Sequence, residues 1–81
     1  MRPEDIEKLL KTQPFVPFRV HLSNGHTFDV KHPETVFLWR THMEHGTPVR
    51  EGSIVMDHKE LYAYIHIARI EILENKQSPA A

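Results

Sequence analysis

Histidine has the widest chemistry of the side chains in this sequence, because imidazole binds metal ions and exchanges protons near neutral pH. The 81 residues include seven histidines and no cysteine. His42 and His45 are the most closely spaced pair, and they enclose the carboxylate of Glu44. Zinc and nickel accept such ligands, so this pair is the first candidate for a metal site.

The spacing of the histidines nevertheless argues against a resident metal. A structural zinc site needs about four ligands, and none of the familiar Cys and His spacings occurs. On a strand, His42 and His45 would point to opposite faces, so a shared ion would require a loop to begin by Glu44. Other ligands would have to be distant histidines, namely His21, His26, His58 or His66. We expect solvated histidines and no cofactor, with His42 and His45 as the pair to test.

An acid–base pair is suggested by Asp29 and His21, which fall on the same face of a predicted hairpin. A nucleophile is missing, because there is no cysteine and Ser23 belongs to the predicted turn. Acid–base catalysis also needs a pocket that shifts pKa values, which a small filled barrel seldom provides. We therefore expect a protein that is not an enzyme.

Aromatic and arginine side chains form another candidate site, because bases stack on aromatic rings and arginine contacts phosphate. The residues of this candidate binding surface are Trp39, Arg40, Tyr62, Tyr64 and Arg69. Tyr62 and Tyr64 would share one strand face. The competing interpretation places Trp39 and Phe37 in the core or in a subunit interface. A net charge of −1 is not the balance of a typical polyanion-binding protein.

A short helix is predicted over residues 2–12. Ile6, Leu9 and Leu10 are spaced i, i+3, i+4 and would form one apolar stripe. So short a helix is unstable alone, which means that the stripe must dock on the rest of the fold. Phe15, which follows the helix, is expected to fill the core beneath it.

The next segment, residues 18–31, alternates apolar and polar side chains and predicts a β-hairpin. A three-residue loop, Ser23–Gly25, keeps the apolar residues of both strands on one face and puts Gly25 at the left-handed position. A slip of one residue would invert every side chain. The predicted pairs are Phe18 with Val30, Arg19 with Asp29, and Val20 with Phe28.

Val36–Met43 is predicted to be a third strand, with large apolar side chains on both faces. Such a strand is covered on both sides. One face would meet the core, and the other would meet either the N-terminal helix or another subunit. The following segment, Glu44–Gly52, contains two of the three glycines and is predicted to be a long loop.

The remaining sequence predicts two more strands. Ser53–Asp57 would be a short fourth strand, followed by a polar turn at Asp57–Glu60. In Leu61–Leu73 the apolar positions change parity, which predicts a strand, a turn or bulge near Ala68, and a last strand. The isoleucines that show the change are Ile65 and Ile67, then Ile70 and Ile72.

One helix and five short antiparallel strands predict a mainly β fold, a small five-stranded antiparallel barrel of the SH3/Sm-like type. Residues 1–73 would form this single domain and residues 74–81 a flexible C-terminal tail. The N-terminus lacks a signal-peptide core, and no segment is long enough to span a membrane. We expect a cytoplasmic protein without a membrane partner.

Two resemblances bear on this fold. The stretch PFVPFRVHLSNGHTFDVKHPE resembles the opening of a family of small uncharacterised bacterial proteins, and this resemblance implies no activity. The layout is also similar to Sm-like proteins, through Leu22-Ser23-Asn24-Gly25 and the junction Ile65-His66-Ile67-Ala68. The second resemblance implies ring oligomers that bind single-stranded RNA. An ordinary SH3-like barrel would fit the same strands.

A domain of this size without disulfides has a marginal core, so self-association is a plausible source of stability. We therefore expect a non-enzymatic binding or assembly module that forms a homo-oligomer through its barrel strands. The first alternative is an Sm-like ring that binds single-stranded RNA. The second alternative is a metal-binding protein that uses its histidines. The partner, RNA or protein, is not specified by the sequence.

Overall fold

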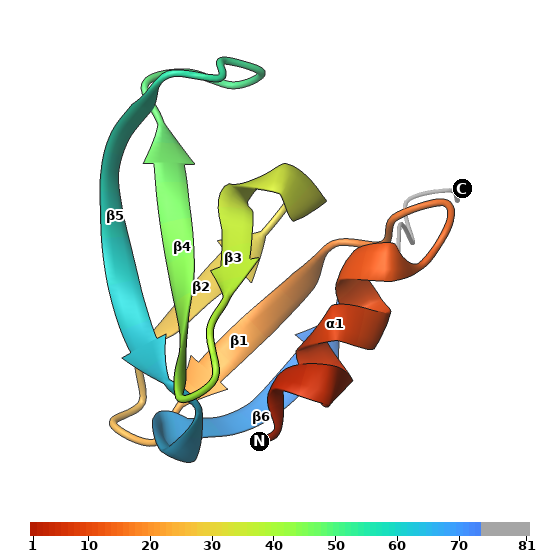
Figure 1. Cartoon of the computed structure of the whole chain (residues 1–81), viewed down its shortest axis with the longest axis vertical. Coiled ribbons are helices and arrows are strands. Elements are labelled where there is room, and N and C mark those ends of the chain that lie inside the picture. The colour runs from red at the N-terminus through yellow and green to blue at the C-terminus, as the bar shows by residue number, and fades with distance from the viewer. Residues whose placement is uncertain (74–81) are drawn as a thin grey trace.

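The computed structural model describes residues 1–73 and is drawn in Figure 1. Among these residues it contains one α-helix, six strands and two short 3₁₀ helices. The bounds are α1 (Pro3–Lys11), β1 (Phe18–Leu22), β2 (Thr27–Val30), η1 (Pro33–Thr35), β3 (Val36–Leu38), β4 (His42–Pro48), β5 (Met56–Ala63), η2 (Tyr64–His66) and β6 (Ile67–Ile72). The tail predicted over 74–81 lies outside the described residues.

The strands form two antiparallel sheets of three strands each, in the orders β2-β1-β6 and β3-β4-β5. The predicted mainly β fold with one N-terminal helix is therefore confirmed. The predicted five-stranded barrel is not confirmed, because six strands are present and no ladder joins the two sheets within residues 1–73. The described residues therefore form two small sheets that face each other, and not a barrel closed by a continuous ladder of strands.

The helix α1 agrees with its prediction. The amide of Arg2 donates a hydrogen bond to the Asp5 carboxylate at 3.3 Å, which closes the N-terminal turn. Ile6 is fully buried, and Leu9 and Leu10 pack against the core from the same stripe. In the described residues no helix has the length and hydropathy needed to cross a membrane.

The first hairpin has the predicted register. Phe18 pairs with Val30 and Val20 with Phe28, so both strands present their apolar residues to one side. Gly25 has a φ of 92°, a conformation that costs little only for glycine. In this segment the glycine turn and the alternation of apolar and polar residues indicate the same strand pairing, which is why the register could be predicted.

The predicted strand Val36–Met43 is wrong, because the chain turns back within it. β3 ends at Leu38, and the amide of Trp39 donates to the carbonyl of His42 at 2.9 Å to close a tight turn. Leu38 then pairs with Met43 across the new hairpin. The turn contains none of the usual glycine, proline, asparagine or aspartate signals, so it was invisible to sequence reasoning.

The predicted loop Glu44–Gly52 and turn Asp57–Glu60 are also wrong. The first half of that loop belongs to β4, and the polar run 57–60 lies in the first half of β5. Thr47 pairs with His58 and Pro48 with Met56, which leaves Asp57 as a bulge. β5 is an edge strand and six of its eight residues are exposed, so polar side chains can occupy both faces.

The chain bends between β5 and β6 through η2, a few residues before the predicted position. The predicted change of parity near Ala68 is a bulge, because Arg69 pairs with His21 while Ile67 pairs with Leu22, and the bend lies separately at η2. The core lies between the two sheets and under α1. It consists of Ile6, Phe18, Val20, Val30, Val36, Met43, Tyr64 and Ile67.

Candidate binding site

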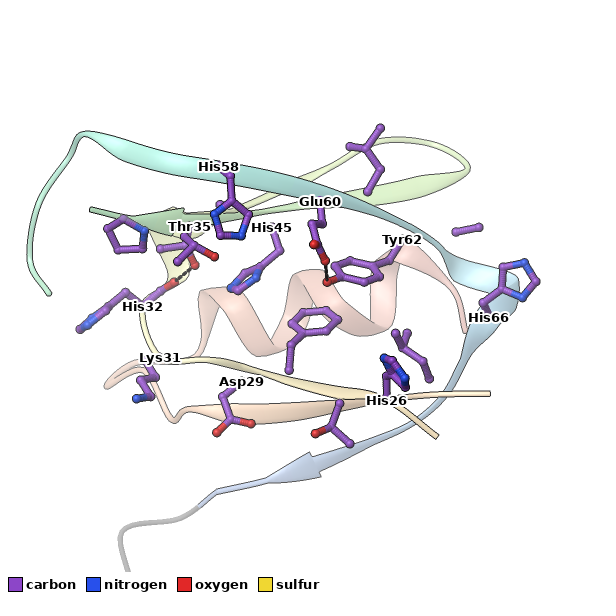
Figure 2. A pocket seen from close by; sticks show the side chains of 18 of the residues that line it. His26, Asp29, Lys31, His32, Thr35, His45, His58, Glu60, Tyr62 and His66 are labelled. Atoms are coloured by element: carbon purple, nitrogen blue, oxygen red, sulfur yellow. Dashed lines mark hydrogen bonds between the residues drawn. The ribbon is translucent and has the colours of Figure 1, made fainter. Parts of the chain in front are cut away.

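A cleft of about 1080 Å³ lies between the two sheets, with β5 and β4 on one side and β2 on the other (Figure 2). Five of the seven histidines of the sequence line it. They come from five separate segments of the chain: His26, His32, His45, His58 and His66. Folding thus gathers histidines that the sequence keeps far apart.

A stack of rings connects the two sheets inside this cleft. The centroid of the Phe28 ring lies 4.2 Å from that of Tyr62, and the two rings are nearly parallel at 15°. The imidazole of His45 lies 4.9 Å from the same phenyl ring. Offset aromatic contacts of this kind stabilise beyond the area that they bury. The stack therefore holds β2 against β4 and β5.

The wall of the cleft formed by β4 and β5 presents polar and titratable side chains. His45 is paired with Glu60 and Thr47 with His58, so these side chains share the inner face of the sheet. Figure 2 shows His45, His58 and Glu60 directed into the cleft. The hydroxyl of Tyr62 donates to Glu60 at 2.6 Å.

Burial changes the pKa values of two side chains in this wall. Burial lowers the pKa of His45, His58 lowers it further, and the carboxylate of Glu60 opposes the change. Burial and the bond to Glu60 raise the pKa of Tyr62 to about 12. At neutral pH the phenol is therefore a hydrogen-bond donor, and His45 is a neutral imidazole.

Two of the carboxylates at the cleft margin already have basic partners. Arg19 donates two hydrogen bonds to Asp29, at 2.7 and 3.1 Å, and this pairing holds the pKa of Asp29 below its usual value. His32 Nε2 lies 2.5 Å from Glu51, whose pKa is likewise lowered. Asp29 is therefore engaged in an ion pair with Arg19, and Glu51 is held by its contact with the His32 imidazole.

The predicted acid–base pair is not formed. Asp29 bonds Arg19, its neighbour in the β1–β2 ladder, whereas His21 Nε2 lies 3.0 Å from Glu71. Glu71 follows from the pairing of β6 with β1, which the sequence did not reveal. The absence of catalytic activity stays a prediction.

The five residues of the predicted aromatic and arginine surface are separated by the fold. Trp39 and Arg40 lie exposed at the β3–β4 turn, and Arg69 is exposed on the other sheet. Tyr62 lines the cleft. Tyr64 is buried in η2, where its hydroxyl donates to the carbonyl of Trp39 at 2.6 Å. The prediction that the tyrosines share a strand face is wrong, because β5 ends at Ala63.

The predicted metal pair is also divided. His42 and His45 lie on opposite faces of β4, as their spacing requires. His42 stacks on Trp39 with a centroid distance of 6.1 Å, while His45 faces the cleft. Within residues 1–73, no three His, Asp or Glu side chains are already arranged to hold a metal ion.

Sequence reasoning named His45 and Tyr62 as separate candidates but did not place them in one wall with His58 and Glu60. A signal was present, because residues 58, 60 and 62 alternate in the manner of a strand face. Interpreting 57–60 as a turn concealed this period. Phe28 was assigned correctly to an inward face, but its partners across the cleft belong to the strands that were misplaced.

A second surface lies on the outer side of the sheet β3-β4-β5, which we call the outer face and define by Phe37, Trp39, Met56 and Leu61. Phe37 pairs with Glu44, which pairs with Leu61, so the three side chains form one row. Phe37 is 57% exposed and Leu61 is 59% exposed. A shallow groove of about 300 Å³ runs past Phe37 and Met56.

In comparisons with known proteins, the chain matches no family model, no curated protein and no solved structure. The functional assignment consequently depends on the cleft and the outer face.

Proposed function

We propose that this protein is a non-enzymatic assembly module whose copies associate through the outer face. The observation that supports this proposal is that Phe37 and Leu61, on either side of Glu44 in one row of the sheet, are both exposed. Trp39 and Met56 extend this apolar area. Burying apolar surface gains about 25 cal/mol per Å². The helix does not supply this burial, because α1 lies beside β1 and β6 (Figure 1).

A second copy of the chain is the occupant that the charges favour. Lys59 and Glu44 form an ion pair at 3.3 Å, and both belong to the outer face of the sheet. In a two-fold contact the same surface patch serves both subunits. A patch with one cation and one anion is complementary to its own copy, since each Lys59 can approach the partner's Glu44.

The face is a better contact than the free edge of β5. Asp57 is bulged out of the ladder there, and charged residues occupy positions 57, 59 and 60. Bulges and charges are devices that protect edge strands from pairing with another chain. Association through the strands therefore uses their outer side chains and leaves the β5 edge free.

The architecture that supports this module is an SH3/Sm-like barrel left open along the cleft, and this assignment is part of the proposal. β2 and β3 are separated only by Lys31, His32 and η1, so they can be counted as one bent strand. The described strands then number five. The 3₁₀ turn η2 between β5 and β6 is the corner that brings β6 back to β1.

Light scattering on a size-exclusion column tests the assembly. The wild-type protein is expected to elute as a dimer or larger oligomer at micromolar concentration. Leu61→Lys is expected to elute as a monomer, because association would then bury the lysine charge within the apolar row. Ile72→Lys is the matched control, since Ile72 is 43% exposed on the other sheet. A monomeric wild type, or equal effects of both substitutions, would overturn the proposal.

RNA binding is the second candidate, favoured by the exposed pair Trp39 and Arg40 at the β3–β4 turn. A stacking ring beside a cation is a common contact for single strands. Fluorescence anisotropy with a labelled oligonucleotide at low salt tests it. RNA binding is supported if the wild-type protein binds the oligonucleotide with an affinity that falls with salt and that Trp39→Ala abolishes. If the wild-type protein leaves the anisotropy unchanged, RNA binding is excluded as the function.

A further inference from the structure

We propose that Leu61 of one copy of the chain enters the groove beside Phe37 and Met56 of a second copy, where Lys59 of the first copy meets Glu34 of the second. This inference rests on the proposed function, because it requires two copies that associate through the outer face. It adds the side chains that meet and the charges that select a second copy as the partner.

Gly46 explains why a groove lies at this place on the outer face. It belongs to β4, and a Cβ at this position would lie 3.1 Å from Sδ of Met56 and 3.5 Å from its Cγ. The absence of a side chain therefore lets Met56 pack directly on the backbone of β4. The space of about 300 Å³ between Met56 and Phe37 stays open as a result.

The backbone conformation does not require glycine at this position. Among residues 1–73, positive φ angles occur at Gly25 and Gly52, and Gly46 is not one of them. Glycine weakens the interior of a strand, and it often marks a place where another group approaches the backbone closely. The unbranched side chain of Met56 can repack around an incoming group. A glycine beneath a methionine thus suits a groove that receives an apolar side chain.

Leu61 is the apolar side chain that suits this groove in a two-fold contact. It lies on the outer face of β5, is 59% exposed, and pairs with Glu44, one row away from the pair Gly46 and Lys59. In a two-fold contact each patch meets the same patch of the other copy, so a projecting side chain must meet a hollow of its own face. The projecting Leu61 and the groove are neighbours on one face, so two reciprocal contacts can form together.

The charges at the groove favour a second copy of this chain as the occupant. Two carboxylates, Glu34 and Glu44, and one ammonium group, Lys59, line the groove. Lys59 and Glu44 form an ion pair at 3.3 Å, whereas Glu34 is exposed and forms no ion pair within residues 1–73. Lys59 precedes Leu61 by two residues on the same face of β5. Leu61 of a second copy therefore brings with it a cation for Glu34.

Charge reversal in two separate variants tests this contact by light scattering over a range of micromolar concentrations. Glu34→Lys and Lys59→Glu each place like charges at both ends of a two-fold contact, so each variant alone should associate at least about tenfold more weakly than the wild type. A one-to-one mixture has opposite charges at both ends and should recover the wild-type mass. Mixing cannot repair the ion pair of Lys59 with Glu44 inside one chain, so recovery identifies a contact between copies.

Gly46→Val tests the groove itself, because the new side chain would push Met56 into the space that Leu61 of the second copy needs. It should weaken association at least about tenfold, while circular dichroism shows a folded protein. Thr47→Val is the matched control and should associate like the wild type. Thr47 is the next residue of β4, and it pairs with His58 on the face that lines the cleft.

The outcomes separate this inference from the proposed function. A monomeric wild type would overturn both. A wild-type oligomer that Leu61→Lys dissociates, but that Glu34→Lys and folded Gly46→Val leave unchanged, would overturn only the groove contact. A mixture of the two charge variants that stays dissociated would also overturn it, and this result decides alone if Gly46→Val is unfolded.

Discussion

At the scale of residues, the ring stack in the cleft joins the two sheets. Phe28 is half-buried between Tyr62 and His45. Phe28→Ala is expected to reduce the free energy of unfolding by about 2–3 kcal/mol, at or below the lower end of the range for fully buried phenylalanine. Urea unfolding followed by circular dichroism measures the change. A loss below about 0.5 kcal/mol, typical of surface positions, would contradict the stack's role.

His45 also makes stability depend on pH. Its pKa is lowered in the folded state by burial, so folding favours the neutral ring. Stability is then complete above the unfolded pKa, about 6.5, and declines as the pH falls below it. The titratable side chains on β5 that face His45 are His58 and Glu60. The melting temperature should fall between about pH 7.5 and 5.5, and it should fall less in His45→Gln. Equal decreases in both proteins would assign the effect to other groups.

At the scale of elements, the turns decide which strands could be predicted. Gly25 is required by its φ of 92°, and a Cβ there would meet no atom within 4 Å. Gly25→Ala should therefore destabilise through backbone strain alone, by about 1–2 kcal/mol. Ser23→Ala, in the same loop, is the control and should change stability by less than about 0.5 kcal/mol. Chemical denaturation of both variants measures the difference, and equal losses would contradict a conformational cause.

The same contrast explains how far the sequence could be interpreted. Residues 2–31 carried agreeing signals, namely a helical stripe, strict alternation and a glycine turn, and both elements were predicted correctly. The β3–β4 turn at Trp39–Thr41 carries no turn residue, so two strands were merged into one. Six of the eight residues of β5 are exposed, so its alternating side chains show little contrast between apolar and polar residues. The interpretation of 57–60 as a turn then concealed the strand period, and the histidine wall of the cleft was not predicted.

At the scale of the whole molecule, the small core and the uncovered outer face are connected. Eight of the residues in 1–73 make up the buried core, while Phe37 and Leu61 remain more than half exposed in one chain. If a second copy covers them, folding and association are coupled. A partner that binds only the folded chain stabilises it by mass action.

This coupling predicts that the melting temperature rises with protein concentration. Across about a hundredfold range of concentration, the wild-type protein should melt progressively higher, because each folded chain gains a partner. Leu61→Lys should melt at a temperature independent of concentration, while Ile72→Lys should follow the wild type. Calorimetric scans at several concentrations measure these shifts. A wild-type melting temperature that stays constant, combined with an unaltered fold, would mean that the outer face is exposed in solution and that the domain is stable as a single chain.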